Sequence, residues 1–212
     1  MIIKVCGMRE PDNIREVAAL CVDWMGFIFY PKSPRRIVDT LACSGKDGET
    51  DSVIRLINSL DVQGKVGVFV DAPTEEMTET AEVYQLNYLQ LHGHESPDVC
   101  KTLRKSGISL IKAFSIAAKD DLKQTADYEG LTDYFLFDTK CEGFGGSGKR
   151  FDWSLLEAYR GATPFLLSGG ISPDSREAVC RFQHPQFAGI DLNSGFESQP
   201  GRKDVNKLKE FI

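Results

Sequence analysis

The chain has 212 residues, of which 42% are hydrophobic and 26% are charged, a composition typical of a globular protein that can bury a core. Its formal net charge of −6 and the lack of a dense Lys/Arg cluster argue against a nucleic-acid partner, because affinity for phosphate backbones comes from clustered basic side chains. No stretch approaches the roughly 18 apolar residues of a membrane span, so no membrane partner is expected either.

The N-terminal sequence favours a cytoplasmic protein, in which cysteines are expected to stay reduced. The start, MIIKVCGMRE, leads directly into a strand and lacks the layout of a signal peptide. The cysteines are scattered without C-x-x-C pairs, so their spacing suggests neither a zinc site nor a redox pair. We expect most of them to be free thiols that pack as small hydrophobic side chains, with Cys6 as a separate case.

Short apolar runs rich in Val, Ile, Leu and Phe recur along the whole chain, separated by turns and by stretches with helical spacing of apolar residues. Helix starts are indicated by Pro11-Asp12, Pro73-Thr74, Ser96-Pro97 and Pro173. A polar segment, 43–52, is predicted to be a surface loop before a helix at 53–60. The eight predicted strands are 2–6, 24–29, 65–70, 87–92, 109–114, 133–138, 164–169 and 187–192.

This regular alternation predicts an α/β protein in which residues 1–212 form a single (β/α)₈-barrel domain, the TIM barrel. The nearly continuous apolar runs suit parallel strands that are covered on both faces. An open doubly wound sheet uses the same alternation but seldom repeats it eight times, so the barrel is favoured.

A barrel places its active site at the carboxyl ends of its strands, which directs attention to a few positions. Cys6 ends the first strand and Asp138 ends the sixth, so both are expected at the mouth of the barrel. Asp191, near the end of the eighth strand, is interpreted as structural, holding N–H groups of a loop.

Glycine-rich segments follow the last three strands and predict a phosphate site. Glycines let backbone N–H groups approach an anion closely, and barrels often bind phosphate with the loops after strands seven and eight. The residues expected to bind substrate there are Gly146, Ser147, Gly148, Gly169, Gly170, Asn193, Ser194 and Gly195.

Two other motifs resemble known binding sites, but each lacks a residue that the site requires. GFGGSGK (143–149) nearly matches a nucleotide-binding P-loop, but Arg150 stands where a hydroxyl should hold magnesium. HGHE (92–95) offers two histidines, but a metal site needs a further ligand and the remaining histidine, His184, lies far along the chain. We interpret HGHE as a solvated loop and expect no metal.

Nearly the whole chain resembles the phosphoribosylanthranilate isomerase family. Each matching string is short, and their order and spacing together carry the resemblance. Asp71 stands where the family usually has Asn, and Asn193 where Ser is common. The strings are KVCGMR, GFIFYPKSPR, VGVFVD, LQLHGHE, IKAF, FDTK, GGSGKRFDW, LSGGISPDS and IDLNSGFESQPGRKD.

The resemblance implies an Amadori rearrangement of N-(5-phosphoribosyl)anthranilate to 1-(2-carboxyphenylamino)-1-deoxyribulose 5-phosphate in tryptophan synthesis. It implies that Cys6 is the general base and Asp138 the general acid. Arg35 would bind the anthranilate carboxylate, although the adjacent Arg36 is an alternative. Because only protons move in this reaction, no cofactor is expected.

The unperturbed pKa values of both groups are wrong for these roles. A free thiol is only a few per cent thiolate at pH 7, which costs roughly 2 kcal/mol, whereas a free aspartic acid is protonated about once in a thousand, which costs roughly 4 kcal/mol. The acid needs the larger shift, so Asp138 is predicted to be the more sensitive position.

Three alternatives remain open. A barrel lyase resembling indole-glycerol-phosphate synthase would be expected to have a Lys at the end of an early strand, and a dual histidine/tryptophan isomerase would pair two Asp residues. A non-catalytic phosphosugar-binding protein would not need the pair of Cys6 and Asp138. The small-molecule partner is a phosphosugar in each case, and the chain could be a monomer or a homodimer.

Overall fold

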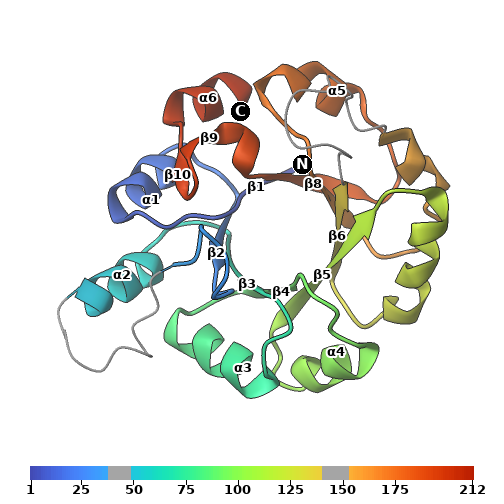
Figure 1. Cartoon of the computed structure of the whole chain (residues 1–212), viewed down its shortest axis with the longest axis horizontal. Coiled ribbons are helices and arrows are strands. Elements are labelled where there is room, and N and C mark those ends of the chain that lie inside the picture. Colours follow the sequence, from blue (N-terminus) through green and yellow to red (C-terminus); the bar gives the residue numbers. More distant parts are fainter. Residues whose placement is uncertain (38–48, 140–152) are drawn as a thin grey trace.

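A computed structural model describes residues 1–37, 49–139 and 153–212. Eight parallel strands close into a barrel in the order of the sequence, each paired with its neighbours and β1 paired with β8 (Figure 1). All eight predicted strands are present, so the predicted α/β barrel is confirmed. The strands are β1 (Ile2–Val5), β2 (Trp24–Ile28), β3 (Gly64–Phe69), β4 (Tyr88–Leu91), β5 (Ser109–Ile116), β6 (Tyr134–Thr139), β7 (Phe165–Ser168) and β8 (Phe187–Leu192).

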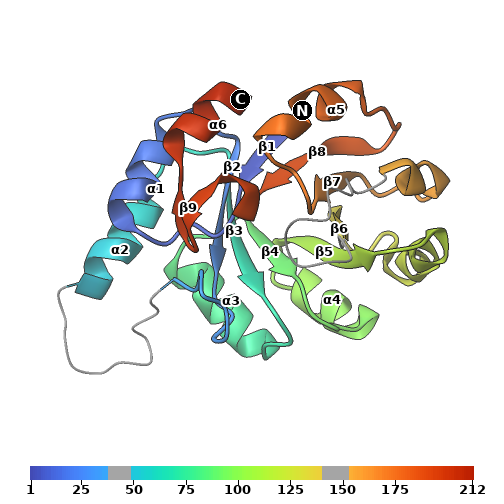
Figure 2. The ribbon, with the colours of Figure 1, turned by 45° about the horizontal axis from the view of Figure 1, so that its top comes forward.

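Helices surround the barrel on the outside (Figure 2). The predicted starts at Pro11, Thr74 and Pro97 are confirmed. At α4 the Ser96 hydroxyl accepts a hydrogen bond from the Val99 N–H at 3.4 Å, with Pro97 next in the chain. The α-helices are α1 (Pro11–Ala18), α2 (Glu49–Asn58), α3 (Thr74–Val83), α4 (Pro97–Arg104), α5 (Arg176–Arg181) and α6 (Val205–Phe211).

The helical ring is less regular than the sequence pattern predicts. Residues 49–52 were predicted to be loop but form the first turn of α2, whereas 43–48 lie outside the described residues. After β5 and β6 the described connections contain 3-10 helices, η1 (Lys119–Tyr128) and η2 (Trp153–Ala158), instead of α-helices. A short 3-10 turn, η3 (Pro173–Ser175), precedes α5.

Apolar side chains pack in two places, as a barrel with an outer ring of helices requires. The larger cluster lies between the strands and the helices and includes Phe27, Phe135 and Leu192. A smaller cluster fills the barrel interior, where the Trp24 ring lies 4.3 Å from that of Tyr88 between centroids. The strands are therefore held rigidly from both sides, which fixes the groups at their carboxyl ends.

The segment after β8 adds a feature that the sequence analysis did not foresee. The turn η4 (Ser194–Phe196) leads into a short antiparallel hairpin of β9 (Glu197–Gln199) and β10 (Arg202–Lys203). The Asn13 side chain on α1 exchanges two hydrogen bonds with the Lys203 backbone, at 2.7 and 2.9 Å. This anchor holds Glu197 and Lys203 beside the end of β1.

The cysteines that the structure describes are free thiols, as predicted. Cys6 and Cys100 are buried, but Cys21 and Cys180 are exposed, so the expectation of core packing is wrong for those two. Cys43 and Cys141 lie outside the described residues. Within the described ranges, none of the helices combines the length and the apolar character that crossing a membrane requires.

Candidate active site

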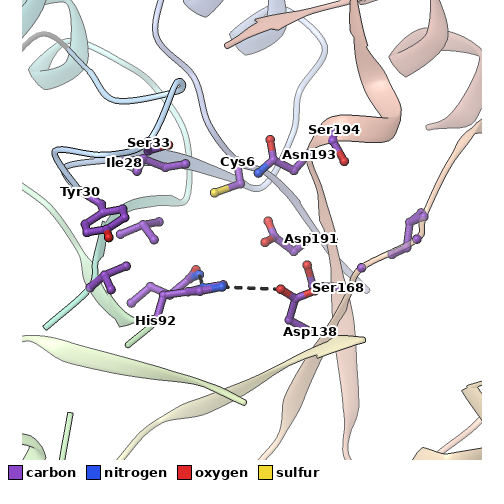
Figure 3. A pocket seen from close by; sticks show the side chains of 16 residues that line it. Cys6, Ile28, Tyr30, Ser33, His92, Asp138, Ser168, Asp191, Asn193 and Ser194 are labelled. Atoms are coloured by element: carbon purple, nitrogen blue, oxygen red, sulfur yellow. Dashed lines mark hydrogen bonds and ion pairs between the residues drawn. The ribbon is translucent and has the colours of Figure 1, made fainter. Parts of the chain in front are cut away.

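A cavity of about 270 Å³ opens at the carboxyl ends of the strands, where the barrel predicts the active site. Figure 3 shows the Cys6 sulfur and the Asp138 carboxyl on the wall of this one cavity. The structure therefore brings together the thiol and the carboxyl that the sequence singled out. Its polar lining includes Cys6, Gln90, His92, Asp138, Asp191 and Ser194.

Cys6 follows β1 directly, and its backbone N–H donates to the Leu192 carbonyl of β8 at 2.9 Å. The residue is 3% exposed. Burial raises the pKa of the Cys6 thiol; the nearby Lys4 ammonium opposes this increase, and Asp191 adds to it. Cys6 is therefore mostly a neutral thiol at neutral pH.

Below Cys6 lies a buried ion pair that the sequence analysis missed. The Lys4 ammonium is 2.9 Å from an Asp191 carboxylate oxygen, and the two side chains are 0% and 5% exposed. Asp191 was predicted to hold N–H groups of a loop, but its hydrogen-bond partner among the described residues is the Lys4 ammonium. A charged residue within the apolar first strand was the available signal, because a buried lysine needs a partner.

Asp138 reaches the cavity from β6 and faces His92 from the end of β4. The His92 Nε2 atom lies 3.6 Å from Asp138 Oδ2 (Figure 3). On the other side of the ring, His92 Nδ1 lies 2.8 Å from Gln90 Nε2. With Gln90 donating, Nδ1 accepts and the ring proton is on Nε2, which faces Asp138. The alternation of Gln90 and His92 along one strand was the signal for this inward-facing pair.

The interpretation of HGHE as a solvated loop is wrong for Glu95. The His94 side chain is 97% exposed, and His92, which lines the open cavity, is also exposed, as predicted. Glu95 is buried and pairs with the buried Lys112 at 3.1 Å. The short-range pattern could not reveal this, because Lys112 comes from the next strand.

The loops after β7 and β8, two of the three predicted to bind phosphate, meet at the other side of the cavity. Gly169 and Gly170 follow β7 with φ of +78° and +65°, a backbone conformation that glycine adopts without strain. Both residues line the cavity together with Asn193 and Ser194.

The other residues predicted to bind phosphate are Gly195 and the three residues at 146–148. Gly195 is not among the lining residues; a Cβ built on it would lie 2.2 Å from the Ile171 carbonyl oxygen. Its lack of a side chain therefore lets the two loops approach each other. The predicted Gly146, Ser147 and Gly148 lie outside the described residues.

Arg35 is partly buried and is held in place by Glu197. The Arg35 Nε and one terminal nitrogen donate to the Glu197 carboxylate at 2.7 to 3.0 Å. Lys203 Nζ donates to the same carboxylate at 2.6 Å and to Asn193 Oδ1 at 2.8 Å. Neither Arg35 nor Arg36 is among the residues that line the cavity.

The carboxylate of Glu197 is charged in this arrangement. Burial alone would raise the pKa of Glu197, but the hydrogen bonds from Arg35 and Lys203 outweigh burial and hold that pKa below its usual value. The same carboxylate raises the pKa of Arg35, although burial acts in the opposite direction.

The closed barrel and the polar groups at its strand ends have the architecture of a (β/α)₈-barrel enzyme with its active site at the carboxyl ends of the strands. A model of the N-(5′-phosphoribosyl)anthranilate isomerase family matches residues 3–212. The chain belongs to this family.

Individual relatives agree with the family match. The chain is 62% identical over 212 residues to the N-(5′-phosphoribosyl)anthranilate isomerase of Parabacteroides distasonis, covering 100% of this chain and 92% of the relative. The crystal structure of phosphoribosyl anthranilate isomerase from Thermotoga maritima matches with a TM-score of 0.81 at 32% identity, over 100% of this chain and 97% of that one.

A further solved structure holds a ligand. It is phosphoribosyl anthranilate isomerase in complex with reduced 1-(o-carboxyphenylamino)-1-deoxyribulose 5-phosphate, and it matches with a TM-score of 0.79 at 29% identity. The match covers 100% of this chain and 96% of that one.

Proposed function

We propose that Cys6 is the general base and Asp138 the general acid with which this isomerase converts N-(5′-phosphoribosyl)anthranilate to 1-(2-carboxyphenylamino)-1-deoxyribulose 5-phosphate, the third step of tryptophan synthesis from chorismate. The observation that carries the proposal is the position of both groups on one cavity, next to Gly169 and Gly170. A solved relative binds a reduced form of this product.

The reaction needs one proton given and one proton taken. Asp138 protonates the ring oxygen of the ribose as the bond from that oxygen to C1 breaks, and the nitrogen lone pair forms a C1–N double bond. The Cys6 thiolate then removes the proton from C2, so that the C2–H electron pair forms the C1–C2 double bond of an enol amine. Tautomerisation gives the ketone at C2 with two hydrogens on C1. Only protons move, so the chemistry calls for no cofactor.

The glycine loops and Arg35 supply binding groups for the two ends of the substrate. Backbone N–H groups around Gly169, Gly170 and Ser194 suit a phosphate, as in other barrels that bind phosphate after strands seven and eight. Gly146, Ser147 and Gly148 are proposed for the same group, and Gly195 for the geometry of the loop. Arg35 is proposed for the anthranilate carboxylate.

The position of Glu197 limits how Arg35 can bind a carboxylate. The guanidinium already uses its Nε and one terminal nitrogen for Glu197, so a substrate carboxylate must approach the edge formed by its two terminal nitrogens. A planar guanidinium has a second edge of this kind, whereas a lysine ammonium does not.

The alternatives differ from this proposal at identifiable positions. A barrel lyase would require a lysine as the base at the end of an early strand, but the lysine on β1, Lys4, is fully buried and paired with Asp191. A dual isomerase would require a second aspartate where Cys6 stands. A non-catalytic binding protein would have no use for a thiol and a carboxyl on one cavity.

Several expectations about the whole protein stay predictions. We propose that residues 1–212 work as one domain in the cytoplasm, as a biosynthetic enzyme of this family would. A monomer and a homodimer are both predicted possibilities; a dimeric form is described for the Thermotoga maritima relative. Sedimentation velocity of the purified chain distinguishes them.

A fluorescence assay tests the proposed function. The anthranilate-containing substrate is fluorescent, and its signal is expected to decay when the purified chain is added. No decay above the uncatalysed rate, with the Parabacteroides distasonis relative as the active control, would contradict the proposal.

A further inference from the structure

The floor of the cavity contains a pair of opposite charges that no step of the mechanism uses. Lys4 and Asp191 are neighbours in register on β1 and β8, and their charged groups are 2.9 Å apart. Lys4 is 0% exposed, so its ammonium cannot touch a substrate in the cavity. Placing an ammonium in the barrel interior is costly, which makes a purely structural explanation weak.

The pair lies directly beneath the proposed base. Side chains alternate along a strand, and both Ile2 and Cys6 pack on clusters inside the barrel, so Lys4 between them also points inward. Lys4 and Cys6 are two residues apart along the same strand, so their side chains lie on the same face, and the charges of Lys4 and Asp191 both act on the Cys6 thiol.

Other charges face Cys6 from the neighbouring elements. Lys203 on β10 favours the thiolate, and Arg35, after β2, also interacts with it electrostatically. Both of these cations are already bound to Glu197, at 2.6 and 2.7 Å. Among the described residues, Lys4 is the cation that acts most strongly on the thiol, and Asp191 is the anion that opposes it.

We propose that the buried Lys4–Asp191 pair controls the ionisation of Cys6, with Lys4 stabilising the thiolate and Asp191 limiting that stabilisation while keeping Lys4 protonated. Lys4 and Asp191 are positioning residues in this arrangement. The catalytic relevance of the pair rests on the proposed role of Cys6 as base.

The two opposing charges match what a base in this reaction requires. Before C2 loses its proton the sulfur must be a thiolate, and afterwards it holds that proton as a neutral thiol. Burial alone would leave too little thiolate, so a cation is needed. An unopposed cation would stabilise the thiolate so strongly that it would become a poor proton acceptor, because basicity falls with the pKa. Asp191 prevents this.

The ionisation of Cys6 can be measured without substrate. Iodoacetamide alkylates a thiolate, forming a carbon–sulfur bond and releasing iodide, and the rate as a function of pH gives the midpoint of ionisation. Because Cys21 and Cys180 are exposed, alkylation is followed by mass spectrometry on the peptide that contains Cys6. Near-ultraviolet circular dichroism of each variant shows whether its packing is native.

The two members of the pair are expected to shift the midpoint in opposite directions. In Lys4→Met the midpoint rises by about one pH unit or more, and in Asp191→Asn it falls by a similar amount. Lys4→Arg retains a cation and is expected to keep the midpoint near that of the unmodified chain. Shifts in the same direction, or none, would overturn the proposal, because a merely structural pair has no reason to give opposite signs.

A double variant covers the case in which Lys4→Met does not fold, since that change leaves Asp191 as an unpaired buried charge. Lys4→Met/Asp191→Asn removes both charges, and its alkylation midpoint is expected to lie above that of Asp191→Asn by about one pH unit or more. Equal midpoints would show that Lys4 does not act on Cys6.

The pH dependence of turnover distinguishes a failure of this proposal from a failure of the proposed function. If the alkylation midpoints move as expected and the pH profile of kcat/KM shifts with them, the pair controls the ionisation of Cys6 and Cys6 is the base. If the alkylation midpoints move but the profile does not, the pair controls Cys6 but Cys6 is not the base. Unmoved alkylation midpoints in an active enzyme would overturn the role of the pair alone.

Discussion

Gly26 on β2 lies so close to Cys6 that a Cβ built on the glycine would be 2.8 Å from the cysteine sulfur and 3.1 Å from its Cα. The absence of a side chain at position 26 is therefore a condition for the position of the thiol. A glycine within a strand weakens it slightly, and here the space that it leaves is occupied by the proposed base.

Gly26→Ala is expected to displace the Cys6 sulfur and lower kcat by about 100-fold, because a displacement of the order of 1 Å is costly in acid–base chemistry. Steady-state kinetics measures the effect.

The control is Gly107→Ala, at a surface turn where a Cβ would meet nothing within 4 Å. It has a φ of +79°, so it should lose stability but keep its kcat. A Gly26→Ala enzyme with unchanged kcat would show that the position of the thiol is unimportant.

Asp138→Asn should reduce kcat more than Cys6→Ser does. A general acid or base contributes about 10²- to 10⁴-fold to the rate. The amide keeps the shape of the carboxyl but cannot donate a proton to the ring oxygen. Single-turnover kinetics of both variants tests this order, and near-normal turnover in Asp138→Asn would remove the proposed acid.

Arg35→Lys is expected to raise KM about tenfold or more with a smaller effect on kcat. A lysine ammonium cannot keep the bidentate contact with Glu197 and at the same time offer a second planar edge to a carboxylate. The matched variant is Arg36→Lys, which should leave KM almost unchanged. If the two variants exchanged these effects, Arg36 would be the residue that binds the anthranilate carboxylate.

The predictable part of this molecule is the part set by local pattern. The eight strands could be predicted because each is a short apolar run, and Cys6, Asp138 and the glycine loops could be placed because strand ends meet at one rim. The Lys4–Asp191 and Glu197–Arg35 pairs could not, since each joins residues far apart in the chain. The helical start of α2 was missed because polar residues fill its first turn.

Stability in acid should depend on Glu197. Its pKa in the folded protein is held below the usual 4.5 by Arg35 and Lys203, so its contribution is fully present above pH 4.5 and is lost as the pH falls through the folded value. Glu197→Gln should lower the free energy of unfolding by about 2 kcal/mol at pH 7, with a smaller difference from the unmodified chain at pH 3. Urea unfolding at the two pH values measures this, and an equal difference at both would contradict the assignment.

The most direct test of the central claim is a crystal structure of this chain with reduced 1-(o-carboxyphenylamino)-1-deoxyribulose 5-phosphate, the compound bound in the solved relative. The account predicts the phosphate against Gly169, Gly170 and Ser194, with C2 of the sugar chain beside the Cys6 sulfur. It also predicts that the Asp138 carboxyl faces the oxygen on C4, which is the ring oxygen of the substrate. A sugar chain bound with C2 out of reach of Cys6, or with Asp138 turned away from that oxygen, would contradict it.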